Sequence, residues 1–148
     1  MNYEKYGISR NDALKLLDKY IQNKNLIKHC LATEAVMKAL AKKMEQDEDK
    51  WGLAGLLHDL DVETQPDLTV HTSETVQILT EKGVTTEVID AIRMHNEMAH
   101  EDKRKQVHTE NIKLTLLQFK TVDYSDCQKF VPFQKAVSGW QHFEFQTW

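Results

Sequence analysis

The side chains of this chain that could do chemistry are histidines and aspartates. His58 and Asp59 are adjacent and directly follow the apolar segment 51–57. Neutral imidazole nitrogens and ionised carboxylates are good ligands for divalent metals. An adjacent pair at the end of a helix can direct both side chains toward one centre, where a metal would activate water for hydrolysis. The pair therefore predicts part of a metal site.

A further ligand must come from another segment, and His29 is a suitable donor. It lies early in a long helical pattern, in which Val36 and Leu40 share roughly its face. An inward-facing histidine among apolar neighbours needs a polar partner. A His-Asp dipeptide is a weak motif on its own, because Asp59 could simply end a helix and His58 could favour the negative end of that helix.

The elements that must position these residues are predicted to be helices. The first part of the chain has the three-four apolar spacing of helices and no alternating strand pattern. We expect a first helix from a cap at Ser9 or Asn11 to Tyr20, a second from 25 to 44, and a short third that ends at His58. A fourth helix is expected from 71 to 82, followed by a left-handed Gly83. A fifth follows a cap at Thr85 or Thr86 and carries Arg93 and His95. Small residues in the third helix should allow close helix approach.

Length and composition favour a single all-α domain over residues 1–148. A chain of 148 residues can bury about two-thirds of its unfolded surface, so it needs no disulfide. Cys30 and Cys127 lie far apart and are expected to be reduced thiols. Residues 112–119 could be helical, but the segment 101–148 as a whole is predicted to be an irregular C-terminal segment, because it has no sustained period.

The charge distribution argues against a protein that binds long nucleic acids. The net charge is −4, from 19 basic and 23 acidic residues that are well mixed along the chain. A chain without a broad positive field does not hold a nucleic-acid backbone tightly, although it can bind a nucleotide. No segment has the roughly 18 apolar residues of a membrane span, and the N-terminus lacks a signal-peptide pattern. We therefore expect a cytoplasmic protein without a membrane partner.

Two stretches of the sequence resemble a known family of enzymes. NLIKHCLATEAVMKALA and KWGLAGLLHDLDVET are similar to the opening of the HD superfamily of metal-dependent phosphohydrolases, and the resemblance covers residues 25–96. It implies an HD-type helical bundle. In this superfamily a helix-borne histidine, the His-Asp pair and a more distant aspartate surround one metal. The resemblance therefore implies ligand roles for His29, His58 and Asp59.

The resemblance also implies a second metal position. Some branches of the superfamily hold a second ion, commonly iron, with two further histidines. His71 in VHTSETVQIL and His95 in AIRMHNE look similar to those histidines. The implied cofactor is one or two divalent ions of iron, manganese, magnesium or zinc. On the residues alone, His71 could instead be a polar residue at a helix start, and His95 an exposed helix residue.

The last aspartate of the family pattern is where this chain departs from it. The family usually places this aspartate in a helix of the type LxxADxxTGL, and Thr115 and Leu116 stand near the expected position. Asp123, in TVDYSD, is the nearest candidate, and Asp126 is the next. Asp123 is therefore the candidate for the closing metal ligand.

Three charged residues near these candidates suggest supporting roles. Asp61 is expected to accept hydrogen bonds behind the ligands, or to be a loop residue. Lys28 and Arg93 each lie within two residues of a candidate ligand. Either could neutralise a substrate phosphate if its side chain turns inward, although isolated basic residues usually face solvent.

Taken with the resemblance, these residues predict a metal-dependent hydrolase of a phosphate ester or pyrophosphate bond. Its partner would be a small phosphorylated substrate, and a nucleotide is the most natural one given the family. The alternative is a noncatalytic HD module that binds metal or a nucleotide for regulation. Aromatic side chains near the C-terminus could in addition form contacts between two copies and so produce a homodimer.

Overall fold

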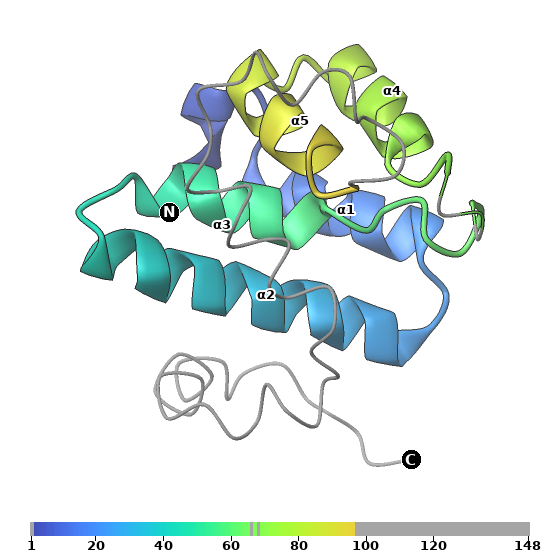
Figure 1. Ribbon diagram of the computed structural model, residues 1–148, viewed down its shortest axis with the longest axis horizontal. Coiled ribbons are helices and arrows are strands. Elements are labelled where there is room, and N and C mark those ends of the chain that lie inside the picture. The colour runs from blue at the N-terminus through green and yellow to red at the C-terminus, as the bar shows by residue number, and fades with distance from the viewer. Residues whose placement is uncertain (1, 66, 68, 97–148) are drawn as a thin grey trace.

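The computed structural model describes residues 2–65, 67 and 69–96 (Figure 1). These residues form helices and no strand, which confirms the predicted all-α fold class. In chain order the elements are η1 (Tyr3–Tyr6), α1 (Arg10–Tyr20), α2 (Lys24–Lys43), α3 (Glu48–Leu57), α4 (Ser73–Glu81) and α5 (Thr86–Arg93). Among these helices, none has the length and apolar surface needed to span a bilayer. The predicted irregular segment 101–148 lies outside the described residues.

α3 is the central helix of the described part. It contacts α2, α5, α1 and η1, and Figure 1 shows it lying along α2, with α5 on its other side. Every residue from Trp51 to Leu57 is buried. A helix that is apolar all round must be covered on all sides, so the composition of this segment explains its central position.

α2 and α3 run antiparallel and approach each other closely (Figure 1). Gly55 permits this approach, because an added Cβ would lie 2.9 Å from Met37 Cγ and 3.0 Å from the main-chain oxygen of Thr33. The predicted close approach of small residues is therefore confirmed. The antiparallel arrangement brings the end of α3, with His58, beside the first half of α2, with His29.

The N-terminal residues are held against α2 by a buried polar cluster. Glu34 is 1% exposed, and its carboxylate accepts hydrogen bonds from Arg10 Nε at 2.9 Å and Arg10 Nη2 at 2.7 Å. The Tyr3 hydroxyl donates a further hydrogen bond to this carboxylate. Burial and the adjacent carboxylate raise the pKa of Tyr3, so the hydroxyl keeps its proton. The charge of Glu34 is thus compensated within the protein.

Most helix limits follow the capping residues. Ser9, and not the alternative Asn11, caps α1, since its hydroxyl accepts a hydrogen bond from the main chain of the first turn. α3 begins at Glu48, before the apolar segment 51–57, because the Asp47 carboxylate caps its first turn. Gly83 follows α4 with a φ of 77°, which confirms the predicted left-handed residue.

Two candidate site residues lie outside the helices that were predicted to carry them. The fourth helix begins after His71 rather than at it, because the side chain of Asp61 caps this helix from outside. α5 ends at Arg93, so His95 lies in the turn that follows. The predicted helical positions of both histidines are therefore wrong.

Gly55→Ala should destabilise the protein, although alanine is the better helix former. The added methyl group must push against Met37 and the main chain of Thr33, and overpacking of this kind costs about 1–3 kcal/mol. Urea unfolding followed by circular dichroism measures the change. Asp18→Ala, at an exposed position of α1, is the control and should change the unfolding free energy by less than about 0.5 kcal/mol. Equal or higher stability of Gly55→Ala would show that the two helices pack less closely than described.

Candidate metal centre

Histidines and one aspartate from separate segments meet where α2, the end of α3 and the turns beside α4 and α5 come together. His29 comes from α2, His58 and Asp59 follow α3, His71 precedes α4, and His95 follows α5. His58, His71 and His95 are buried, Asp59 is 9% exposed, and His29 is partly buried. The tertiary structure thus brings together five of the candidates from the sequence.

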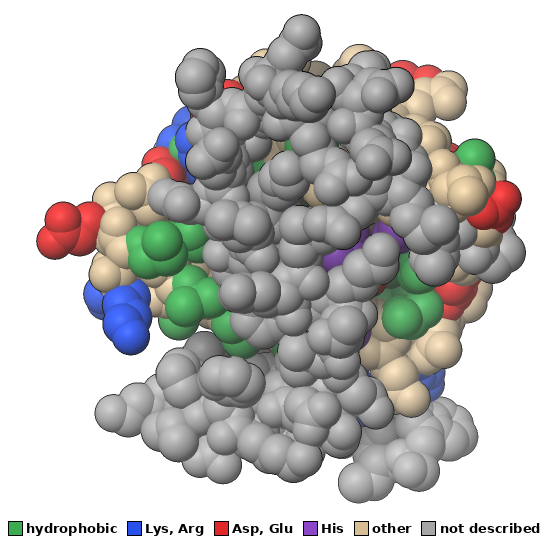
Figure 2. Space-filling model, in the orientation of Figure 1, with side chains coloured by type: hydrophobic (Ala, Val, Ile, Leu, Met, Phe, Trp, Pro, Cys, Tyr) green, Lys and Arg blue, Asp and Glu red, His purple; other side chains and the backbone are tan. Residues whose placement is uncertain are grey.

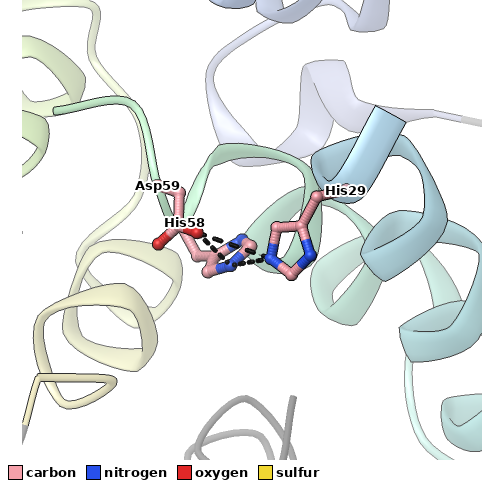
Figure 3. A group of neighbouring side chains, drawn as sticks. All are labelled: His29, His58 and Asp59. Atoms are coloured by element: carbon pink, nitrogen blue, oxygen red, sulfur yellow. Dashed lines mark hydrogen bonds and ion pairs between the residues drawn. The ribbon is translucent and has the colours of Figure 1, made fainter. Parts of the chain in front are cut away.

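One oxygen of Asp59 faces two of the histidines. Asp59 Oδ2 lies 3.0 Å from His58 Nε2 and 3.4 Å from His29 Nε2, and the two Nε2 atoms are 3.2 Å apart. Figure 3 shows these side chains pointing toward one another from α2 and from the end of α3. The spacing suits ligand atoms that each lie about 2.0–2.2 Å from one ion.

The other oxygen of Asp59 faces the remaining two histidines. Asp59 Oδ1 lies 3.2 Å from His71 Nε2 and 3.6 Å from His95 Nε2. The ring of His95 also stands edge-on to the ring of His58, with centroids 4.9 Å apart. Asp59 is therefore common to two ligand groups, namely His29, His58 and Asp59, and Asp59, His71 and His95.

The hydrogen bond of His58 shows which of its nitrogens presents a lone pair to the centre. His58 Nδ1 lies 2.8 Å from the main-chain oxygen of Gly55, which can only accept, so Nδ1 carries the proton and donates it. In the neutral ring Nε2 is then an acceptor, yet it lies 3.0 Å from the acceptor Asp59 Oδ2. Two acceptors at this distance need a proton or a metal cation between them. A divalent metal fits, because imidazole and carboxylate are its common ligands.

The charges of the centre depend on one another. Burial disfavours a charged Asp59, but the neighbouring histidines, first among them His58, outweigh burial and hold the pKa of Asp59 well below its ordinary value. Burial also opposes a charged His71, yet the carboxylates of Asp59 and Asp61 raise the pKa of His71 to about 9. Burial lowers the pKa of His95. The carboxylate is thus ionised, and protons compete with a divalent cation for the nitrogens.

Asp61 lies behind the centre and fixes the turn that carries His71. Its carboxylate accepts hydrogen bonds from the main-chain N–H groups of Thr72, Glu74 and Thr75, each at 3.1 Å. Its Oδ1 atom also lies 2.9 Å from His71 Nδ1, a contact whose geometry is not that of a hydrogen bond. This geometry agrees with the predicted role of Asp61 as an acceptor behind the ligands.

Two other candidates from the sequence, Lys28 and Arg93, belong to neither ligand group. Lys28 is partly buried and directly precedes His29 on α2, where adjacent side chains point about 100° apart. Arg93 Nη1 donates a hydrogen bond to Asp90 Oδ1 at 3.1 Å. Contact of either side chain with a phosphate stays a prediction. Asp123 lies outside the described residues, so the closing ligand also stays a prediction.

Two polar residues that hold the segments around the centre, Glu63 and Asn96, were not predicted from the sequence. Asn96 Nδ2 donates a hydrogen bond to the main-chain oxygen of His71 at 2.8 Å. Glu63 accepts hydrogen bonds from the main-chain N–H groups of Gln22 at 2.8 Å and of Asn23 at 2.7 Å. Their proximity to candidate ligands in the sequence was a signal, but the partners are distant in the chain and no local pattern predicts them.

Comparison with known proteins identifies one family. The family model of the HD domain matches residues 26–126. This range is more than half of the chain and contains all five residues of the centre, as well as Asp123. No curated protein and no solved structure matches the chain.

The protein purified without chelator should contain a divalent metal, which elemental analysis detects. Asp59→Asn should lose this metal, because Asp59 is common to both ligand groups. Asp67→Asn removes an exposed carboxylate from the loop between Asp61 and His71 and should keep the metal. Chelation should lower the thermal stability, since a ligand at 100 times its Kd adds about 2.7 kcal/mol to the unfolding free energy. Equal metal content in Asp59→Asn and wild type would contradict the assignment.

Proposed function

The chain belongs to the HD domain family, and from this premise we propose that it is a metal-dependent phosphohydrolase. The proposed reaction is hydrolysis of a phosphate ester or a pyrophosphate bond in a small molecule. HD domains are mostly metal-dependent phosphohydrolases. The observation that carries the proposal is the position of Asp59, whose two oxygens each lie within 3.6 Å of two imidazole nitrogens.

The residues proposed to hold the metal are those of the centre. A divalent ion bound there supplies an activated water and polarises a phosphoryl oxygen. The hydrogen bond from His58 Nδ1 to the main chain of Gly55 orients the ring, so that Nε2 presents its lone pair to the centre. The burial of His58, His71 and His95 excludes bulk water, which strengthens the electrostatic interactions of the centre.

The donor set favours iron or zinc over magnesium as the proposed metal. Imidazole nitrogens outnumber carboxylate oxygens in both ligand groups, and magnesium prefers oxygen ligands. Manganese is also compatible, because it accepts carboxylate as well as imidazole. On the family pattern alone, we propose Asp123 as a further ligand.

A nucleotide is the proposed substrate class, on the basis of the family. Its phosphates would bring negative charge to a chain whose net charge is already −4, so cations must compensate them. The metal supplies part of this compensation, and Lys28 and Arg93 are proposed to contact phosphate oxygens. A guanidinium has five N–H donors, and the contact of Arg93 with Asp90 uses one of them.

Turnover of phosphate esters by the metal-loaded protein tests the proposed reaction. We expect hydrolysis of p-nitrophenyl phosphate, or of members of a nucleotide panel, with added iron or manganese. Asp59→Asn should lower kcat more than about 100-fold. Removal of a residue that only orients a ligand lowers activity by up to about 100-fold, and loss of a shared ligand should have a larger effect. Asp67→Asn is the matched control and should retain the wild-type kcat, because its carboxylate is exposed.

Two other outcomes of this experiment would change the conclusion. Stoichiometric metal without turnover of any substrate in the panel would favour a noncatalytic module that binds metal or nucleotide for regulation. A wild-type protein that binds no metal would contradict the centre itself.

Arg93→Ala should raise KM about tenfold, which corresponds to about 1.4 kcal/mol and is near the lower end for a hydrogen bond to a charged group. Metal content and kcat should stay near wild type. Lys43→Ala removes an exposed charge at the end of α2 and is the control. Steady-state kinetics of both variants provide the comparison, and Lys28→Ala extends it to the second proposed contact. An unchanged KM in Arg93→Ala would remove this residue from the substrate site.

A further inference from the structure

We infer that Asp61 and Asn96 are positioning residues for His71. Together they hold the turn before α4, so that the imidazole of His71 faces Asp59. The inference rests on the proposed metal-dependent function and concerns one of the two ligand groups. The first half-site consists of His29, His58 and Asp59, and the second half-site of Asp59, His71 and His95.

The turn that carries His71 includes a strained residue. Thr72 has a φ of 75° and a ψ of −12°, in the left-handed region, which β-branched residues rarely adopt. This conformation is sterically unfavourable and persists only where neighbouring groups hold it. Thr72 is fully buried. The groups packed around the turn must therefore supply the restraint.

Asp61 provides the first restraint. Its Oδ1 atom accepts a hydrogen bond from the main-chain N–H of Thr72 and lies 2.9 Å from His71 Nδ1. Its Oδ2 atom accepts from the N–H groups of Glu74 and Thr75, and so caps α4, for which the Thr72 side chain makes no capping hydrogen bond. Because Asp61 is 0% exposed, water does not compete for these donors. One carboxylate thus fixes the start of α4 and the main chain of the turn that carries His71, and it also contacts the ring of His71.

Asn96 provides the second restraint. Its Nδ2 atom donates a hydrogen bond to the main-chain oxygen of His71 at 2.8 Å, and both residues are buried. Asn96 directly follows His95, and the rings of His71 and His95 have centroids 5.9 Å apart. This hydrogen bond therefore links the two segments that carry the imidazoles of the second half-site.

The first half-site is positioned in a different way. His29 lies within α2 and His58 caps the end of α3, so the packing of these two helices positions both side chains. His71 and His95 lie in turns, where helix packing does not set their direction. Removal of a positioning residue should therefore disturb the second half-site and spare the first.

Glu63 offers a matched control on the same turn as Asp61. Its carboxylate accepts hydrogen bonds from the main-chain N–H groups of Gln22 and Asn23, so it too restrains the start of a helix, in this case α2. Glu63→Ala removes a carboxylate and two main-chain hydrogen bonds but leaves the turn of His71 untouched.

Titration of the metal-free full chain with Mn²⁺, followed by electron paramagnetic resonance, tests the inference. Wild type should bind two ions, and the signal of spin-coupled ions should grow as the second ion binds. Asp61→Asn should lower the affinity for the second ion about 10–100-fold, the usual effect of removing a residue that orients a ligand. The affinity for the first ion should stay near the wild-type value. Asn96→Ala should act in the same direction. Glu63→Ala should titrate like wild type.

The same titrations contain the results that would overturn the inference. One is an unchanged affinity for the second ion in Asp61→Asn. Another is an equal loss of affinity for both ions in a variant whose circular dichroism spectrum is native. If Asp61→Asn does not fold, Asn96→Ala is the deciding variant, and an unchanged affinity of that variant for the second ion overturns the inference. A wild type that binds one ion also overturns it but leaves the proposed hydrolase standing. A wild type that binds none overturns both.

Discussion

The carboxylate of Asp59 is buried and ionised, and the side chains around it are imidazoles. A buried charge costs several kcal/mol unless a partner compensates it. Glu34 shows the other solution in this fold, because the permanently charged Arg10 and the hydroxyl of Tyr3 satisfy its carboxylate. Imidazoles compensate a carboxylate only by taking up protons or by sharing a cation. This difference separates a structural polar cluster from a centre suited to a metal.

The turn after α3 links this carboxylate to the rest of the fold through acidic residues at alternate positions. Asp59 lies in the centre, Asp61 caps α4, and Glu63 accepts hydrogen bonds from the residues before α2. The start of each of these helices is thus tied to the segment that carries the shared ligand. The close packing of α3 on α2, which Gly55 permits, determines where this segment lies. The geometry of the centre and the packing of the helices are therefore parts of one arrangement.

Much of the helical fold could be predicted from the sequence, because helix formation depends on neighbours in the chain. The apolar spacing, the Ser9 cap and the left-handed Gly83 are all local signals. The predictions were wrong for the helical positions of His71 and His95. The cap of α4 comes from Asp61, which is outside that helix and lies 11 to 14 residues before its partners. A spacing rule for helices does not include such partners.

By itself, the sequence determined which ligand atoms are present and which family motif they resemble. The adjacency of His58 and Asp59 and the helical position of His29 were enough to predict part of a metal site. Only the tertiary structure decided that Asp59 serves two histidine pairs, one on each oxygen. The physical reason is that side chains from distant segments converge through the packing of helices and the restraint of turns. Both depend on contacts between residues far apart in the chain, which local spacing does not encode.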